Sequence, residues 1–200
     1  MVTEDNMPKD NKTADRVQAM LNFIGGDDVL DALMAGRARL EIVLIKHTVD
    51  LGAPPRLPFD GAEVVKHKGT GVVEIELRQD DHLYVGGKKV ELFLSTRQMG
   101  SKAIVGHELL VELEGGKQVL LNSNVLGYLC DHPELFPEHW KKDANGETRY
   151  IFFWGSIFRN PSGGNLYVRC LCWSGGRLYR SRNWLGNDWG RRCPSASLAS

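Results

Sequence analysis

The chain has 200 residues, of which 42% are hydrophobic and 25% charged, and its formal net charge at neutral pH is zero. These values are ordinary for a soluble protein large enough to fold without cross-links, and the neutral total does not indicate a nucleic acid or an anionic membrane as partner. The four cysteines, Cys130, Cys170, Cys172 and Cys193, form no C-x-x-C pair and have no histidine at zinc-finger spacing, so we expect a reducing compartment, no disulfide framework and no metal.

The first 12 residues are polar and acidic, and we predict that they form a disordered leader. They contain no apolar stretch, so they do not resemble a secretory signal. No apolar run in the chain approaches the roughly 20 residues that span a bilayer. We therefore expect a cytoplasmic protein that does not insert into membranes, with export by another route left open.

Residues 13–37 are predicted to form an accessory helical segment. In the first helix, which Thr13 or Asp15 can cap, apolar residues recur three and four apart until Gly25-Gly26. A second helix is predicted to begin at Asp27 or Asp28 and to end at Gly36. We expect a helical hairpin packed on the main domain, and a partner-binding helix is the alternative.

The next hundred or so residues are predicted to be mainly β-structure. Residues 40–49 (LEIVLIKHTV) are rich in β-branched side chains, and residues 72–77 alternate apolar and acidic side chains, as a half-buried strand does. Residues 83–94 contain Gly86-Gly87 between two apolar stretches, which predicts a hairpin. The sequence therefore indicates a mixed α+β domain.

Two further segments precede the C-terminal region. Residues 109–121 fit either two strands separated by Gly115-Gly116 or a short helix that ends there. Ser123 or Asn124 is then predicted to open a helix that continues to Cys130 and stops before Pro133.

From residue 150 onward, strand-like and turn-like segments alternate. We predict strands over residues 150–159 (YIFFWGSIFR) and 166–173 (LYVRCLCW), joined by a turn over residues 160–165 (NPSGGN). Residues 177–194 are then rich in Arg, Gly, Asn and Trp.

The composition of the chain changes abruptly near residue 148. Lys, Glu, Gln and Met together supply thirty-two of residues 1–147 and none of residues 148–200. The last 53 residues carry eight Arg against one acid, Asp188, whereas the first 147 carry seventeen Lys and Arg against twenty-four Asp and Glu. The neutral total therefore conceals an acidic body of formal charge −7 and a basic tail of +7.

Three interpretations of this tail are open. Arg and aromatic side chains serve phosphate contact and base stacking, so the tail could be a basic nucleic-acid-binding module, although such surfaces usually use Lys as well. The tail could also be a β-rich edge of the core whose composition favours Arg. The third interpretation concerns codons: randomising the two adenines of an asparagine codon gives Arg, Ser, Gly, Tyr and Cys among others, but never Lys, Glu, Gln, Met or Trp. The residues between the tryptophans of the tail all belong to the permitted set.

The order of several motifs resembles the variable proteins of diversity-generating retroelements, in particular those of candidate-phylum bacteria. The motifs are LNSNVLGYLCDHPELFPEHWK, YIFFWGSIFR, NLYVRCLCW and NWLGNDW, preceded by LEIVLIKHTVDLGAPP and VELFLSTRQ. The resemblance covers residues 38–200 and implies a C-type-lectin-like domain there, with a variable region at about residues 166–194. It also implies that an error-prone reverse transcriptase copies a template repeat, mutates its adenines and replaces the 3′ end of the gene with the copy.

The resemblance separates the tail into two sets of residues. The scaffold set, which we expect to be core, consists of Trp154, Trp173, Trp184 and Trp189. The variable, ligand-binding set consists of Cys170, Cys172, Ser174, Gly175, Arg177, Tyr179, Ser181, Arg182, Asn183, Gly186, Asn187, Gly190, Arg191, Arg192 and Cys193. Cys170 and Cys172 stand where the family often has Tyr, and Leu178 and Arg180 depart from it because many relatives have Trp there.

The variable set is typical of an adaptable binding surface. Tyr brings contact area at low entropy cost, Ser, Gly and Asn bring hydrogen bonds, and Arg recognises carboxylate or phosphate in a bidentate manner. Randomly chosen side chains must point outward, because a buried Arg needs a partner that random substitution cannot supply. We therefore expect Arg182, Arg191 and Arg192 to be exposed, and the partner to be an undetermined ligand, protein or other macromolecule.

An enzyme is not expected. The chain contains no G-x-S-x-G, P-loop or Rossmann glycine pattern, and His107-Glu108 lacks the second histidine of a zincin motif. No base is apparent beside Cys170 or Cys172. We therefore predict a non-catalytic binding protein without a cofactor.

Overall fold

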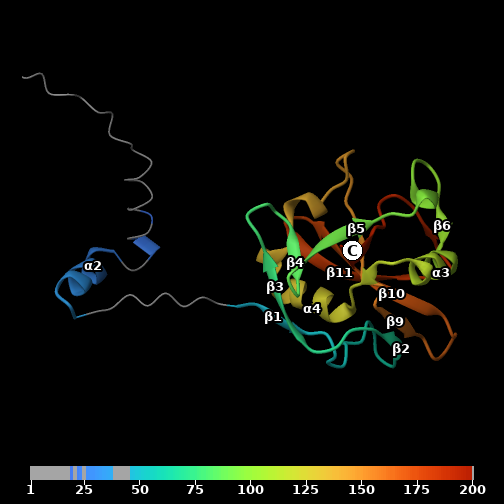
Figure 1. Ribbon diagram of the computed structural model, residues 1–200, viewed down its shortest axis with the longest axis horizontal. Coiled ribbons are helices and arrows are strands. Elements are labelled where there is room, and N and C mark those ends of the chain that lie inside the picture. Colours follow the sequence, from blue (N-terminus) through green and yellow to red (C-terminus); the bar gives the residue numbers. More distant parts are fainter. Residues whose placement is uncertain (1–18, 20–21, 24–25, 38–45, 200) are drawn as a thin grey trace, which may run out of the picture. The chain divides into compact units, whose positions relative to one another are not determined.

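The computed structural model describes residues 19, 22–23, 26–37 and 46–199 (Figure 1). The chain divides into two compact units, Met1–Ile45 and Lys46–Ser200. The predicted leader, most of the first predicted helix and the expected domain boundary at residue 38 lie outside the described residues. No described helix has the length and apolar character needed to cross a membrane.

The first unit contains α2 (Asp27–Met34). Its position agrees with the second predicted helix, but the N-cap is Gly26, whose φ of 73° favours glycine, and no side chain caps the helix. Asp27 and Asp28 instead lie in the first turn, where carboxylates interact favourably with the helix dipole.

The second unit is a mixed α+β structure, mostly sheet with a few short helices, which agrees with the predicted fold class. Its helical elements are η1 (Thr96–Gln98), α3 (Gly106–Gly115), α4 (Ser123–Asp131), η2 (Pro133–Leu135) and η3 (Glu138–Trp140). Its strands are β1 (Thr48–Asp50), β2 (Glu63–His67), β3 (Val72–Leu77), β4 (Leu83–Val85), β5 (Lys88–Phe93), β6 (Ile104–Val105), β7 (Val119–Leu120), β8 (Ile151–Phe152), β9 (Ser156–Arg159), β10 (Leu166–Ser174), β11 (Arg177–Trp184), β12 (Asp188–Trp189) and β13 (Ser195–Leu198).

Within the described residues, the strands form one large sheet and one small one. The large sheet has the order β1-β3-β4-β5-β13-β8-β10-β9-β2, with β11 added beside β10 and β7 beside β13. The small sheet pairs β12 with β6. β13, which joins the β5 and β8 halves of the large sheet, was not predicted, because its four small residues (SASL) carry no strand signal. The last residues of the chain therefore lie at the centre of the sheet.

Several predicted elements agree with the structure. The 83–94 hairpin turns at Gly86 and Gly87, both of which have positive φ. The ambiguous 109–121 segment is mainly helical, as α3. The helix predicted from Ser123 or Asn124 is α4, and its N-cap is Asn122, whose side chain accepts from the Asn124 amide at 3.0 Å.

Two predicted strands differ from the structure. The 150–159 segment forms two short strands, β8 and β9, because the chain turns at Gly155. That glycine lies against the backbone of Leu121, where an added Cβ would meet the carbonyl carbon at 2.8 Å. Of the 40–49 segment, only Thr48 and Val49 belong to a described strand, and residues 40–45 are not described.

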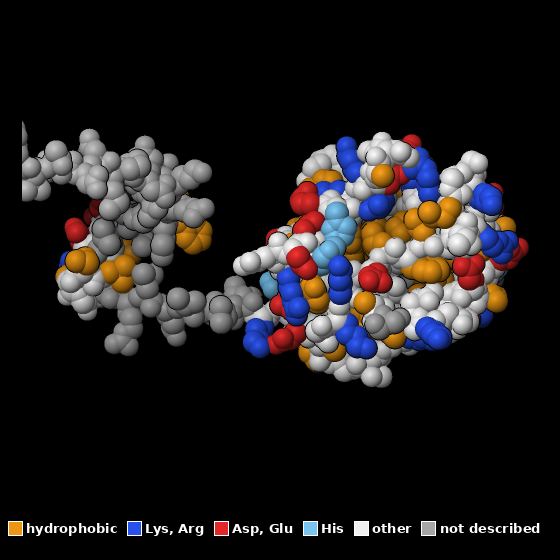
Figure 2. Space-filling view, turned by 45° about the horizontal axis from the view of Figure 1, so that its top comes forward, with side chains coloured by type: hydrophobic (Ala, Val, Ile, Leu, Met, Phe, Trp, Pro, Cys, Tyr) orange, Lys and Arg blue, Asp and Glu red, His pale blue; other side chains and the backbone are white. Residues whose placement is uncertain are grey.

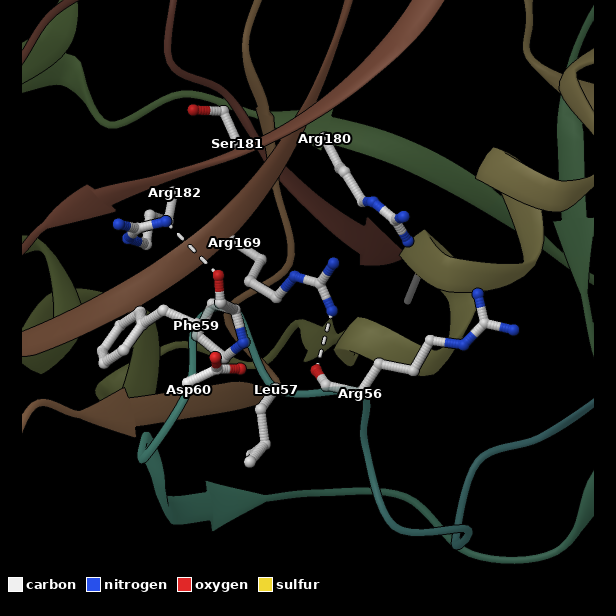
Figure 3. Close-up of a pocket in the computed structure, with 9 residues that line it drawn as sticks. Arg56, Leu57, Phe59, Asp60, Arg169, Arg180, Ser181 and Arg182 are labelled. Atoms are coloured by element: carbon white, nitrogen blue, oxygen red, sulfur yellow. Dashed lines mark hydrogen bonds between the residues drawn. The ribbon is translucent and has the colours of Figure 1, made fainter.

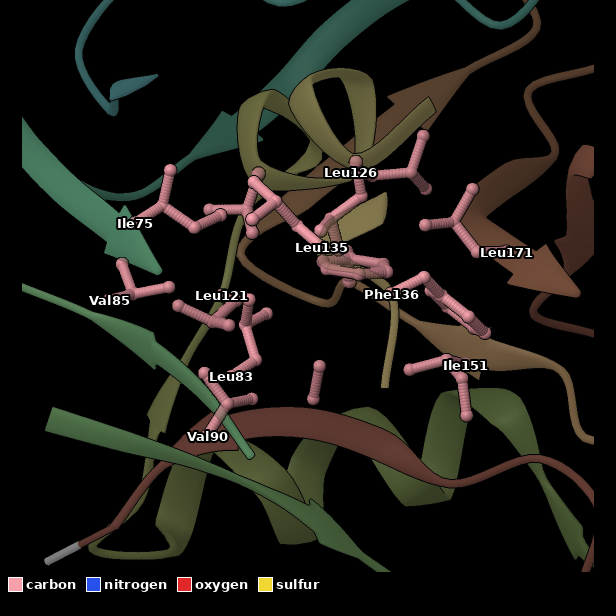
Figure 4. Packing of buried hydrophobic residues seen from close by; sticks show 14 of the residues in the cluster. Ile75, Leu83, Val85, Val90, Leu121, Leu126, Leu135, Phe136, Ile151 and Leu171 are labelled. Carbon is pink, nitrogen blue, oxygen red and sulfur yellow. The ribbon is translucent and has the colours of Figure 1, made fainter. Parts of the chain in front are cut away.

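Two hydrophobic clusters lie on opposite sides of β10. The first includes Leu126 of α4 and Leu171 of β10, together with side chains from β3, β4 and β5 (Figure 4). The second includes Leu109 of α3 and Cys170 of β10, together with Trp189. Because successive strand residues point to opposite faces, β10 contributes alternately to the two clusters.

Candidate ligand-binding site

The centre of the predicted variable region is an antiparallel ribbon of β10 and β11. Direct register pairs include Cys170 with Ser181 and Cys172 with Tyr179. Residues that are directly opposed share a face of the ribbon, and alternate residues follow them. The predicted variable residues that consequently share one face are Cys170, Cys172, Ser174, Arg177, Tyr179, Ser181 and Asn183.

Solvent reaches only part of this variable face. Ser174, Arg177, Tyr179 and Ser181 are exposed, and Asn183 is half-buried. Strand β11 pairs only with β10 among the described strands, so its side chains meet less of the core than those of β10. Gly175 continues the exposed surface at the hairpin turn, where its φ is 55°.

Cys170 and Cys172 do not lie on the surface as predicted. Cys170 is 2% exposed and packs in the second cluster, and Cys172 is also buried. Burial raises the pKa of the Cys170 thiol, and the neighbouring thiols of Cys172 and Cys193 raise it further. The thiol is therefore protonated at neutral pH and lacks the nucleophilic thiolate form. Residue type and spacing gave no signal of this burial, which results from strands on both sides of β10.

The predicted tryptophan scaffold is only partly buried. Trp154 and Trp189 are fully buried, and their ring centroids lie 4.8 Å apart. Trp173 is partly buried against the first cluster. Trp184 is 39% exposed, which contradicts the expectation that it is core: it lies at the end of β11, beyond the reach of the main clusters.

The loop after β11 is fixed to the N-terminus of α3. The Gly106 amide donates to the carbonyl of Asn187 at 3.1 Å, and the His107 amide donates to that of Leu185 at 3.0 Å. Leu185 itself is fully buried. The loop thus supplies acceptors for two amides at the start of the helix, and it holds Gly186 and Asn187 in a defined place.

Arg182 and Arg192 are exposed, as predicted, and Arg191 is partly exposed. The Arg191 guanidinium donates to the carboxylates of Asp143 and Glu147. The prediction of exposed arginines is therefore confirmed for Arg182 and Arg192, and only in part for Arg191.

The remaining predicted variable residues lie around a second depression. Gly190, Arg191, Arg192 and Cys193 line a pocket of about 320 Å³ together with Asp188 and residues 100–103. Cys193 is half-buried and packs against the second cluster. The predicted set therefore divides among the ribbon, the loop after β11 and this depression.

Acidic and basic side chains are mixed over the face of the second unit in Figure 2, with hydrophobic side chains near its middle. Contacts of the tail with the body show the same mixing. Arg159 lies 3.8 Å from Glu63, and Arg191 is paired as described above. The basic tail is therefore partly neutralised by the acidic body.

One pocket beside the ribbon is lined by four arginines. It has a volume of about 530 Å³ and is lined by Arg56, Leu57, Pro58, Phe59, Asp60, Arg169, Arg180, Ser181 and Arg182. Arg169, Arg180 and Arg182 share the face of the ribbon opposite Cys170. Figure 3 shows the Arg169 and Arg182 side chains directed toward the 56–60 loop, while Arg180 extends to the side toward a helix and the Ser181 side chain points away. Sequence reasoning missed Arg56 and Arg169, because the pocket joins segments more than a hundred residues apart.

Among the residues that the structure describes, one serine–histidine contact resembles part of a catalytic triad. The Ser156 hydroxyl lies 2.8 Å from His67 Nδ1, and His67 Nε2 lies 3.0 Å from the carbonyl oxygen of Leu51. Ser156 is fully buried, and it also bonds Ser123. A substrate cannot reach this hydroxyl, so it is not an accessible nucleophile. Its two bonds tie β9 to β2 and to α4.

Within the described segments, one group of side chains has the spacing of metal ligands. The ligand atoms of His47, His132 and Glu134 lie within 4.8 Å of one another. His132 Nδ1 lies 3.0 Å from Glu134, and His47 Nδ1 lies 3.1 Å from the Tyr128 hydroxyl. These polar atoms already have partners, and the expectation of no metal stays a prediction.

The chain matches no protein-family model, and comparison with curated proteins and with solved structures finds no similar protein. Function must therefore be argued from the site itself.

Proposed function

We propose that this protein is a hypervariable ligand-binding protein, diversified at its C-terminus by adenine-directed mutagenic retrohoming and built on a C-type-lectin-like scaffold. One observation carries the proposal. None of the five predicted variable residues of β11 is buried, although they were chosen by residue type and motif alone. Arg177, Tyr179 and Ser181 are exposed on one face of the ribbon, where Asn183 is half-buried, and Arg182 is exposed on the opposite face. A diversified protein requires this arrangement, because changes at those positions do not disturb the core.

The surroundings of the surface also support the proposal. Leu185 and Trp189 lie outside the predicted variable set, and Trp cannot arise from a randomised asparagine codon. Both residues are fully buried beside α3. They anchor the loop between the predicted variable residues of β11 and those of residues 190–193. In this loop the two fixed side chains face inward, whereas Gly186 between them is half-buried and Asn187 is exposed.

A nucleic-acid-binding module is the alternative, and the contacts of the tail favour it less. A phosphate-tracking surface needs its cations in a continuous row. Here Arg191 is paired with Asp143 and Glu147, Arg159 lies beside Glu63, and three other arginines face the pocket. Salt-dependent binding of DNA by the purified protein would revive this alternative.

The test compares the 3′ end of the gene with a near-identical repeat elsewhere in the same genome. We expect the differences to fall at adenines of the repeat, within the codons of residues 170–193, and we expect a reverse transcriptase gene nearby. Differences scattered over all four bases, or the lack of any repeat, would overturn the proposal.

A further inference from the structure

Arg169 is a buried cation without a carboxylate partner among the described residues. Its side chain extends from β10 and is 4% exposed. The guanidinium donates one hydrogen bond there, from a terminal nitrogen to the carbonyl of Arg56 at 2.8 Å. A guanidinium has five N–H donors, so most of this one's donors lack an acceptor in the described part of the chain. Such a desolvated charge is costly unless an anion accompanies it.

The neighbours of Arg169 add charge of the same sign. Burial lowers the pKa of the Arg169 guanidinium, and the nearby cations Arg180 and Arg56 lower it further. Figure 3 shows the Arg169 side chain extending between those two residues. Four guanidinium groups therefore line the pocket, and Asp60 is the one carboxylate among the described lining residues.

The contacts of the other arginines neutralise little of the positive charge in the pocket. A terminal nitrogen of Arg56 lies 3.1 Å from a carboxylate oxygen of Asp131, and about half of the Asp131 side chain is exposed to solvent. Arg182 lies over the Phe59 ring at 4.8 Å and donates to the Pro58 carbonyl at 3.3 Å. Arg180 has no side-chain hydrogen bond or ion pair within the described part of the chain. The pocket thus holds an excess of positive charge that the described residues do not balance.

We propose that this pocket binds a small molecule carrying a phosphate monoester or a similar dianion, with Arg169 at the base of the site and Arg180 and Arg56 beside it. Guanidinium groups bind phosphate oxygens in a bidentate manner. The volume of about 530 Å³ is within the range of small-molecule sites, and Leu57 and Phe59 supply apolar walls for the rest of the ligand.

This proposal rests on the proposed function, because it takes the ribbon to be a ligand-binding surface. It adds a part of the site that does not vary. Arg56 and Arg169 lie outside the predicted variable set, whereas Arg182, whose side chain faces the pocket, belongs to it. Variants of this protein would therefore share the anion-binding base and differ at its rim. The two proposals fail separately, because the nucleotide comparison is independent of any binding measurement.

The experiment is isothermal titration calorimetry of the full chain with phenyl phosphate, inorganic phosphate and benzoate at low salt. We expect phenyl phosphate to bind with a Kd below about 1 mM, inorganic phosphate to bind more weakly, and benzoate, which has the same ring and a single charge, to bind weakest. Arg169→Met should weaken phenyl phosphate binding by about tenfold or more, because it removes charge-assisted hydrogen bonds.

Matched variants separate binding from folding. Replacing a desolvated cation by an apolar side chain need not destabilise a protein, and a thermal melt of Arg169→Met checks this. Arg180→Gln removes a pocket cation whose side chain makes no hydrogen bond or ion pair with the described residues, so it should weaken binding even if Arg169→Met misfolds. Arg78→Gln makes the same charge change at an exposed position outside the pocket and outside the variable set, and it should leave the Kd unchanged. Equal affinity for benzoate and phenyl phosphate, no binding of either phosphate, or equal loss in Arg180→Gln and Arg78→Gln would overturn the proposal.

Discussion

Cys170 and Ser181 are directly opposed across β10 and β11 and share one face of the ribbon, yet Cys170 is 2% exposed and Ser181 is exposed. The difference comes from their strands. β10 has neighbours on both edges, β8 and β9 on one and β11 on the other, and its Cys170 face is covered by the second cluster. Position in the sheet, rather than residue type, therefore decides which residue of the pair can vary.

The pair gives a direct test of this conclusion. We expect Cys170→Asp to destabilise the protein by at least about 3 kcal/mol, because it places an unpaired charge in the core. Ser181→Asp should change the free energy of unfolding by no more than about 0.5 kcal/mol, as exposed substitutions usually do. Urea denaturation of both variants measures the two values, and Cys170→Ala controls for loss of the thiol. Similar values for the two aspartate variants would refute the assignment of an inner and an outer strand.

A helix or a turn could be predicted where the residues that determine it lie within the same short stretch of sequence. The 83–94 hairpin follows from two glycines that accept positive φ, and α4 follows from its cap and from Pro133. The strand β13 was missed because pairing with β5 and β8, not its own residues, makes it a strand. β9 was merged with β8 because the approach of Gly155 to Leu121 depends on a segment more than thirty residues away.

The candidate site was predictable only as a list of residues. The alternation of Tyr179 and Ser181 on an exposed face agrees with the prediction. The burial of Cys170 and the exposure of Trp184 do not, because both depend on which strands flank them. The arginine pocket could not be found from sequence, since Arg56 and Arg169 are joined only by the fold.

Gly106 is the point where the variable segment meets α3. A Cβ at this position would lie 2.7 Å from the carbonyl oxygen of Leu185 and 2.9 Å from its Cα, and would also contact the Trp189 ring. Backbone atoms cannot move aside as a flexible side chain can. We expect Gly106→Ala to destabilise the protein by about 1–3 kcal/mol, as overpacking does. Gly115→Ala, at the other end of α3 where a Cβ meets nothing within 4 Å, should be neutral or stabilising. Equal effects in chemical denaturation would show that the loop does not rest on Gly106.

The two tryptophans of the NWLGNDW motif should differ in their effect on stability. Trp189 is fully buried, with its ring centroid 4.2 Å from that of Phe152, so Trp189→Ala should cost about 3–5 kcal/mol. Trp184 is partly exposed, and we expect Trp184→Ala to cost roughly 1–2 kcal/mol because less apolar area is lost. Thermal and urea unfolding of the two variants gives the comparison. A larger loss for Trp184→Ala would mean that the exposed ring has a role the structure does not explain.

Asp81 should make stability depend on pH in the acid range. Its carboxylate accepts from the backbone amides of Glu138 and His139 and lies 2.9 Å from His139 Nδ1. Desolvation alone would raise the pKa of Asp81, but these hydrogen bonds outweigh it and hold the pKa below the ordinary value of 3.8. A carboxyl whose folded pKa is lowered contributes stability above its unfolded pKa and loses it as the pH falls through the folded pKa.

Asp81→Asn isolates this contribution. Asp81 has a φ of 57°, and Asn also accepts this left-handed conformation, so the variant removes the charge while keeping the backbone. We expect the wild type to be more stable than Asp81→Asn by a constant amount above about pH 5, and the difference to shrink steadily toward about pH 2. Urea denaturation over that range measures it. A difference that stays constant to the lowest pH, or grows as the pH falls, would show that Asp81 stabilises the loop through its shape and not through its charge.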